Sequence, residues 1–206
     1  MVDGSGETMR IEVRRGDELG EEYRRAIAEV FVEGFGDDLA YFARDPARLT
    51  EAVEHMLVLE RFHVALIDGR PAALASLTEG DQEAIDHDAR TLRGHLGLVK
   101  GTIADRVFRT HFQGGTATSR PGRAEIGFVA SARRFRGRGA AKAVLNHLLA
   151  LPGYDEYTLE DIKDNNAPAL GLYEHLGFRE YRRNPTRHAR WSGFDAYVSM
   201  RRTTGP

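Results

Sequence analysis

The residues best suited to chemistry lie in a glycine- and arginine-rich segment between an expected strand, 124–129, and an expected helix, 140–149. This segment, Val129 to Gly139, reads V-x-x-x-x-R-x-x-G-x-G. Its glycines would let backbone N–H groups approach a ligand closely, and the start of the helix would attract an anion. Three arginines add positive charge there: Arg134, Arg136 and Arg138. The segment predicts a pyrophosphate-binding turn; a glycine-rich connection with solvated arginines is the alternative.

A second segment places an asparagine and a tyrosine at the two ends of a short expected helix. Asn166 can cap this helix, Pro168 is tolerated in its first turn, and Gly177 is typical of the residue that ends a helix. Tyr173 follows Asn166 by seven residues, nearly two helical turns. Both ends of the helix can therefore face one groove.

Together the two segments resemble the GNAT superfamily of N-acetyltransferases. The signature [QR]-x-x-G-x-[GA] of that family is matched by Arg134, Gly137 and Gly139. Its later pattern N-x-x-A-x-x-L-Y-x-x-x-G-F is matched by Asn166, Ala169, Leu172, Tyr173, Gly177 and Phe178. The resemblance is close over about residues 125–179, and the remainder fits the same fold in order.

The resemblance implies an acetyl-CoA site and a role for several residues in it. Backbone N–H groups of Phe128 and Val129 would receive the thioester oxygen, and Asn166 would bond the pantetheine, a role that Asn165 could exchange with it. Tyr173 would be the general acid near the sulfur, with aromatic packing as the alternative. The residues expected to bind the cosubstrate are Phe128, Val129, Arg134, Phe135, Arg136, Gly137, Arg138, Gly139, Ala140, Asn166 and Tyr173.

Acetylation of an amine also needs a base, because an alkyl ammonium has a pKa near 10.4. Glu125 on the expected strand before the turn is our candidate, since several family members carry a glutamate there and burial would raise its pKa. Two alternatives remain open. Glu125 could form an ion pair with an arginine such as Arg123, or the base could act through ordered water.

The elements expected along the chain predict an α/β fold that is GNAT-like. A strand over 10–14, helices over 18–34 and 47–57, and a hairpin of strands 62–67 and 71–77 precede the cofactor half. A break is expected at residues 34–37, and Asp68-Gly69 signals the hairpin turn. With two final strands over 179–183 and 194–201, we expect a mixed, largely antiparallel sheet of about seven strands, covered by helices on both faces.

The expected domain spans residues 9–202, with a disordered tail over 1–8, a frayed tail over 203–206 and an acetyl-CoA-binding core over 124–179. A helical insertion over 79–122 separates the third and fourth strands, as one long helix or two short ones followed by a mobile loop over 113–122. Six apolar residues of the insertion should be buried: Leu92, Leu96, Val99, Ile103, Val107 and Phe108. The insertion could line the acceptor pocket, which we expect, form a homodimer contact or extend the core.

Composition excludes several other classes of site. The chain has no cysteine, so disulfides, thiolate nucleophiles and cysteine zinc sites are absent, and its eight histidines show no metal-binding spacing. No apolar run is long enough for a membrane span and no secretory signal is visible, so we expect a cytoplasmic protein. A net charge of −2 makes nucleic acid an unexpected partner. Acidic residues crowd positions 17–38, which would either attract an amine or form solvated helix faces.

The sequence thus predicts an acetyl-CoA-dependent N-acetyltransferase without a metal. It would act directly on a primary amine of a small molecule, an amino acid or a protein. A catalytically silent acyl-CoA sensor is the alternative, which retention of Tyr173 and Asn166 disfavours.

Overall fold

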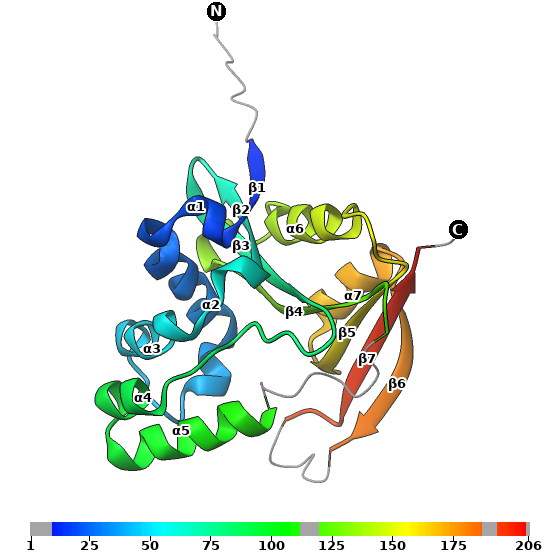
Figure 1. Ribbon diagram of the computed structural model, residues 1–206. Helices are drawn as coiled ribbons and strands as arrows, with labels where there is room; N and C mark the ends of the chain where they lie inside the picture. Colours follow the sequence, from blue (N-terminus) through cyan, green and yellow to red (C-terminus); the bar gives the residue numbers. More distant parts are fainter. Residues whose placement is uncertain (1–9, 112–119, 187–192, 205–206) are drawn as a thin grey trace, which may run out of the picture.

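The computed structural model describes residues 10–111, 120–186 and 193–204, and shows a seven-stranded sheet with helices around it (Figure 1). The strand order is β1-β2-β3-β4-β5-β7-β6, and every neighbouring pair is antiparallel except β4 with β5. The strands are β1 (Ile11–Arg15), β2 (Phe62–Ile67), β3 (Arg70–Thr78), β4 (Arg123–Ser131), β5 (Glu156–Lys163), β6 (Arg179–Pro185) and β7 (Ala196–Thr203). This confirms the expected mixed, largely antiparallel sheet.

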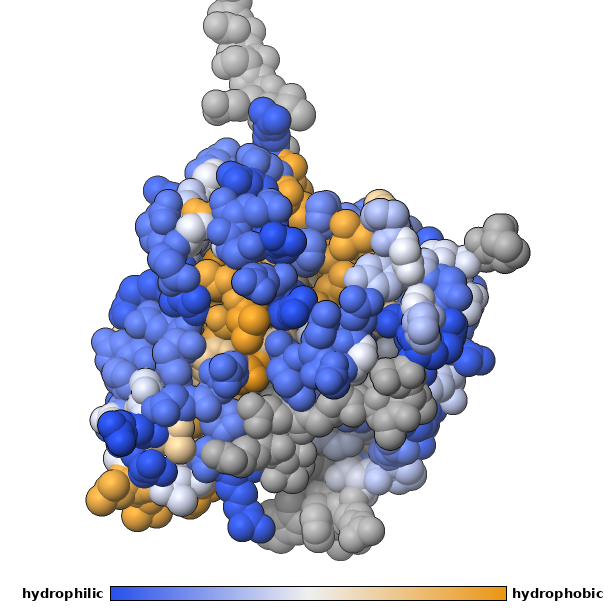
Figure 2. Space-filling model, in the orientation of Figure 1, coloured by the Kyte–Doolittle hydropathy of each residue, from blue (hydrophilic) through white to orange (hydrophobic). Residues whose placement is uncertain are grey.

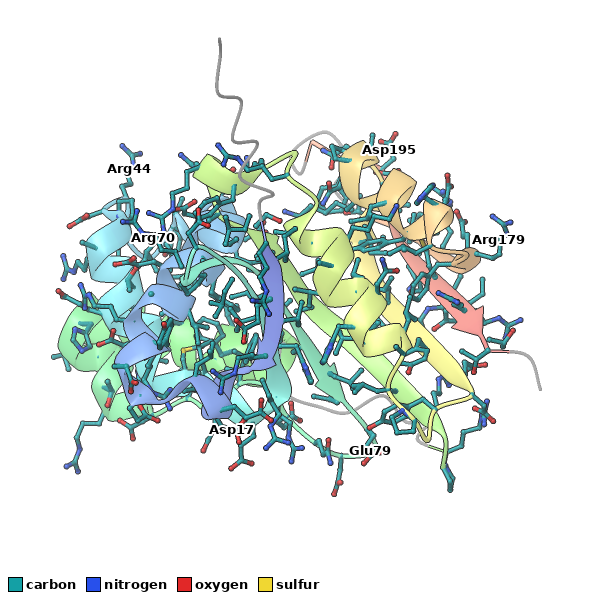
Figure 3. All side chains as sticks on the ribbon, turned by 90° about the horizontal axis from the view of Figure 1, so that it is seen from above. Asp17, Arg44, Arg70, Glu79, Arg179 and Asp195 are labelled. Carbon is teal, nitrogen blue, oxygen red and sulfur yellow. The ribbon has the colours of Figure 1, made fainter. Side chains whose placement is uncertain are left out.

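Helices cover both faces of the sheet, as expected. They are α1 (Gly16–Leu19), α2 (Arg24–Leu39), α3 (Pro46–Val53), α4 (Ala89–Leu96), α5 (Leu98–His111), α6 (Ala140–Leu149) and α7 (Ala167–His175), with short 3-10 turns at 21–23, 54–56, 59–61 and 133–135. Successive residues of β2 show the two faces: the Phe62 ring lies 6.5 Å from Phe31 of α2, and the His63 ring lies 5.1 Å from His147 of α6. Viewed from above, α2 and α6 flank the strands (Figure 3).

The hairpin turn between β2 and β3 is the one that the sequence signals. Asp68 and Gly69 have φ values of 51° and 70°. Two positive φ values in a two-residue loop give the twist that joins antiparallel strands, and aspartate followed by glycine tolerates them best.

The break expected at residues 34–37 is wrong, because α2 continues through them to Leu39. Gly34 does not end the helix; it allows close packing, because a Cβ there would lie 2.5 Å from the Cβ of Ala130 on β4. The helix expected over 18–34 instead divides earlier, at Gly20, whose φ is 91°.

The insertion between β3 and β4 forms two helices, α4 and α5, which meet at Gly97 with a φ of 85°. It packs beside α3 and the segment after α2, where Arg48 Nε donates to the His95 carbonyl at 2.7 Å and Lys100 Nζ donates to the Phe42 carbonyl at 3.2 Å. Leu92, Leu96 and Phe108 are buried and Val107 is partly buried. The expected burial of Val99 and Ile103 is wrong, since α5 turns their side chains outward.

The exposed start of α5 forms apolar surface at the corner of α4 and α5 (Figure 2). Leu98 and Val99 are 76% and 74% exposed there. Most of the loop expected over 113–122 lies outside the described residues, as does the tail expected over 1–8. At the other end, β7 continues to Thr203, and the Thr204 hydroxyl donates to the Tyr154 carbonyl at 3.0 Å.

Candidate active site

The parallel strands β4 and β5 pair only at their beginnings and then separate. The pairs run from Arg123 with Glu156 to Glu125 with Thr158. Beyond them each strand contains a residue with positive φ, Phe128 at 48° and Asp161 at 52°, and each has a register shift against its other neighbour. These bulges bend the two strands and leave an opening in the middle of the sheet.

A cavity of about 470 Å³ occupies this opening. Its walls come from β4, β5, the end of α2, the residues just before α7 and Tyr173 of α7. The main lining residues are Phe35, Asp37, Asp38, Gly127, Phe128, Val129, Glu160, Asp161, Lys163, Asn165, Asn166 and Tyr173. The structure therefore brings together four residues that the sequence selected from two separate segments: Phe128, Val129, Asn166 and Tyr173.

The glycine-rich segment lies directly after β4, between a short 3-10 turn, Arg133–Phe135, and the start of α6. Gly137 and Gly139 have φ values of 75° and 81°, which disfavour any side chain. A Cβ at either position would meet no atom within 4 Å, so the surface above them is open. Among the described residues, no side-chain hydrogen bond caps the start of α6. The first N–H groups of α6 are therefore available to an anion.

Arginines flank this glycine-rich turn and lie over a buried ring. The guanidinium groups of Arg134 and Arg138 are 4.8 and 5.8 Å from the centre of the Phe135 ring. The segment 134–140 forms no part of the cavity wall. Its positive φ glycines, open surface and exposed arginines fit the diphosphate of acetyl-CoA, with β4 leading from the cavity straight to the turn.

Glu33 is a residue of this region that sequence reasoning missed. Its carboxylate on α2 accepts the backbone N–H of Arg133. The contact joins residues 100 positions apart, and the only sequence signal is that Glu33 belongs to the acidic run of the second helix.

Tyr173 lies at the buried side of the cavity. Asn166 caps α7 by accepting the Ala169 N–H at 3.3 Å, as expected, and Gly177 ends the helix region with a φ of 90°. The tyrosine ring lies 6.1 Å from Phe178, and only 5% of the residue is exposed. In the described part of the chain its hydroxyl has no hydrogen-bond partner, and burial raises its pKa. The phenol therefore keeps its proton at neutral pH.

Glu125 lies at the last pair of the β4–β5 ladder, beside the cavity rather than in its wall. Across β3, Ser76 is paired with both Phe62 and Gly127. Glu125 is two residues before Gly127, so it points to the same face as Phe62, the face covered by α2. This register decides the orientation that the sequence left open.

The surroundings of Glu125 favour its protonated form. Burial, followed by the charges of Glu160 and Asp161, raises the pKa of Glu125 to about 7; Arg123 acts in the opposite direction and Glu83 adds slightly to the rise. The Arg123 side chain bonds Glu156 at 2.9 Å.

Glu160 is another residue that the sequence did not single out. Its carboxylate accepts the Tyr181 hydroxyl and the Arg182 guanidinium, the latter at 2.7 Å. Hydrogen bonding to Glu160, together with burial as the larger cause, raises the pKa of Tyr181 to about 12. These contacts depend on the pairing of β5, β7 and β6, which no local pattern reveals.

Two classes of feature are absent from the described residues. Among them, no three histidine, cysteine, aspartate or glutamate side chains are arranged to hold a metal ion. Their helices also include none that combines the length and apolar character needed to cross a membrane.

Known proteins give an independent comparison. A sequence model of the Acetyltransferase (GNAT) family matches residues 26–178. A comparison with curated protein sequences found no match. Among solved structures, the histone acetyltransferase HPA2 and related acetyltransferase from Corynebacterium glutamicum is 20% identical, with 96% of this chain and 99% of that chain covered and a TM-score of 0.60.

Two further structures extend this comparison. An N-acetyltransferase from Staphylococcus aureus Mu50 is 16% identical, with 93% and 100% of the two chains covered and a TM-score of 0.60. A chain of the NatC complex bound to Gag peptide and CoA is 16% identical, with 96% and 100% covered and a TM-score of 0.55. At these identities the structures show a shared fold.

Proposed function

Because the chain belongs to the acetyltransferase (GNAT) family, we propose that it transfers an acetyl group directly from acetyl-CoA to a primary amine. The acceptor would be a small molecule, an amino acid or a protein amine. The observation that carries this proposal is the cavity between β4 and β5, which the largely buried Tyr173 lines and beside which Glu125 lies.

Acetyl-CoA would lie with its diphosphate at the turn 134–140 and its pantetheine toward Asn166. Gly137 and Gly139 support this assignment because the space above them is open and their φ values exclude a side chain. Bound there, acetyl-CoA supplies an acetyl group activated as a thioester. We assign the backbone N–H groups of Phe128 and Val129 to the acetyl oxygen, since the bulge at Phe128 turns this stretch into the cavity wall.

Glu125 would accept the proton of the incoming ammonium. With its pKa raised to about 7, Glu125 is a stronger base than an ordinary glutamate. Tyr173 would hold a proton at its hydroxyl and give it to the departing thiolate, whose reference pKa is about 8.5. Its raised pKa keeps that proton available over the whole working range.

The test is the release of free thiol from acetyl-CoA across a panel of amines, amino acids, polyamines and peptides with free N-termini. Calorimetry of CoA binding accompanies it. Acetylation of at least one amine, with the acetylated product identified by mass, is the expected result. Tight CoA binding with no thiol release from any acceptor would replace the proposal with a silent acyl-CoA sensor.

A further inference from the structure

The cavity between β4 and β5 is lined by more negative than positive side chains. Its charged residues in the described part of the chain are four carboxylates, Asp37, Asp38, Glu160 and Asp161, and one ammonium, Lys163. Two of the carboxylates are compensated: Lys163 pairs with Asp38, and Arg182 bonds Glu160. Asp37 and Asp161 form no ion pair or side-chain hydrogen bond with any described residue. The lining therefore carries two surplus negative charges.

The ion pair between Lys163 and Asp38 holds together the two segments that carry Asp37 and Asp161, which we call the acidic rim of the cavity. It joins the end of α2 to the end of β5 across the cavity. Asp37 precedes Asp38 on α2, and Asp161 lies two residues before Lys163 on β5. Both free carboxylates line the same cavity.

A second observation points to a ligand in this cavity. The Tyr173 hydroxyl is in a side chain that is about 95% buried, faces this cavity and has no described partner. A hydroxyl that ends such a buried side chain, opens to the cavity and has no described partner is placed to hydrogen-bond a bound molecule. Asp37 and Asp161 line the same cavity as this hydroxyl.

We propose that the acceptor carries a second cationic group besides the amine that is acetylated, and that Asp37 and Asp161 bind this second group. This inference rests on the proposed acetyl transfer. Unpaired carboxylates attract an ammonium or guanidinium and repel the carboxylate of a free amino acid. The acceptor class is thus a diamine, a polyamine or a peptide with a basic residue near the reacting amine.

The test compares two acceptors that differ only in the second charge, 1,4-diaminobutane and butylamine. A tripeptide with a free N-terminus and arginine at its second position is compared in the same way with one carrying norleucine there. We expect kcat/KM to be about tenfold higher for the dicationic member of at least one pair, since two carboxylates act on it. Equal values in both pairs would overturn the inference.

Three variants show whether the two carboxylates cause the preference. Asp37→Asn should raise KM for the preferred acceptor by about three- to fivefold and leave butylamine unaffected. Asp161→Asn should raise that KM to the same extent. Because Asp161 also raises the pKa of Glu125, butylamine is compared in this variant at a pH above the rising limb, where its kcat/KM should match the wild type. Asparagine tolerates the positive φ of Asp161, so this variant keeps the backbone. Glu29→Gln removes the same charge from an exposed position of α2 away from the cavity and should change neither acceptor.

The outcomes separate this inference from the proposed function. If thiol release is observed but kcat/KM is equal for the dicationic and monocationic acceptors, acetyl transfer stands and the inference of a second cationic group on the acceptor is wrong. A preference that persists unchanged in both aspartate variants would also overturn the role of this rim. Absence of thiol release with every acceptor would overturn both proposals.

Discussion

Glu125 and Glu160 are carboxylates on neighbouring parallel strands, and their contacts make them different. Glu160 is held by Arg182 and Tyr181, which fixes its negative charge beside the end of the β4–β5 ladder. Glu125 has a pKa raised to about 7, first by burial and next by Glu160. The base would thus owe part of its strength to the charge of Glu160.

This relation predicts the effect of Glu160→Gln on the pH profile. Since Glu125 must be ionised to accept a proton, kcat/KM should rise with pH through about 7. Removing the Glu160 charge lowers the pKa of Glu125, so the rising limb should move to lower pH. The neighbouring charges of Asp161, Glu83 and Arg123 remain in this variant.

Glu180→Gln is the matched control for that profile. Glu180 is an exposed carboxylate on β6 that pairs with Arg183 at 2.7 Å. Its removal should leave the limb in place. A limb that stays fixed in Glu160→Gln, or moves equally in both variants, would contradict a specific effect of Glu160.

Glu125 should also cost the protein stability at alkaline pH. Its pKa is about 7 in the folded chain against an ordinary 4.5, so its contribution to stability is fully present below pH 4.5 and is lost as pH rises through 7. Glu125→Gln has no charge to bury. We expect its free energy of unfolding, measured with urea, to exceed that of the wild type by about 3 kcal/mol at pH 8 and to equal it at pH 4. Equal values at both pH values would contradict the buried carboxylate.

At the scale of elements, local patterns predicted most helices and strands, and contacts between distant segments explain the failures. Asn166, Asp68-Gly69 and Gly177 gave correct boundaries because each acts on its own backbone. The break predicted at Gly34 was wrong because this glycine lets α2 approach Ala130, which is distant in sequence. The bulge at Phe128 and the bonds around Glu160 likewise depend on strand pairing, and no short pattern encodes that pairing.

The contact between α2 and β4 predicts opposite effects for two glycines of one helix. Gly34→Ala would place a Cβ 2.5 Å from the Ala130 Cβ, so the strain of overpacking should lower the free energy of unfolding by about 1–3 kcal/mol. Gly36→Ala meets only Val32 at 3.9 Å and should raise it by up to about 1 kcal/mol through helix propensity. Urea denaturation measures both. Stabilisation by both alanines would contradict the close approach of α2 to β4.

The turn before α6 predicts a selective loss of CoA binding. Gly137→Val places a side chain over the open surface of the turn, at a φ of 75°. CoA affinity, measured by calorimetry, should fall at least about tenfold, because the diphosphate can no longer approach the backbone. Gly153→Val is the control: its φ is 96°, it is equally open and it lies outside the turn. If the two variants lose affinity equally, the turn is not the diphosphate site.

Across the whole molecule, positive and negative side chains gather at different sites, although the net charge is only −2. Exposed arginines surround the turn before α6, and free carboxylates line the cavity rim. The sequence could predict the first group because a family motif contains it. Of the second it predicted only that the acidic run over 17–38 could attract an amine, because Asp37 and Asp161 come to line one cavity only through the packing of α2 beside the sheet. That the insertion over 79–122 lines the acceptor pocket stays a prediction. Its described residues are not in the cavity wall, and residues 112–119 lie outside the described chain.

The central claim is acetyl transfer in which Tyr173 supplies a proton, and the most direct measurement compares two tyrosine variants. The Tyr173→Phe variant should bind CoA with unchanged affinity and lose about 10²-fold in turnover number. Tyr157→Phe removes another buried hydroxyl, one that donates to the Leu148 carbonyl at 2.9 Å, and should keep its turnover number. A Tyr173→Phe enzyme that turns over as fast as the wild type when acetyl transfer limits the rate would contradict the claim.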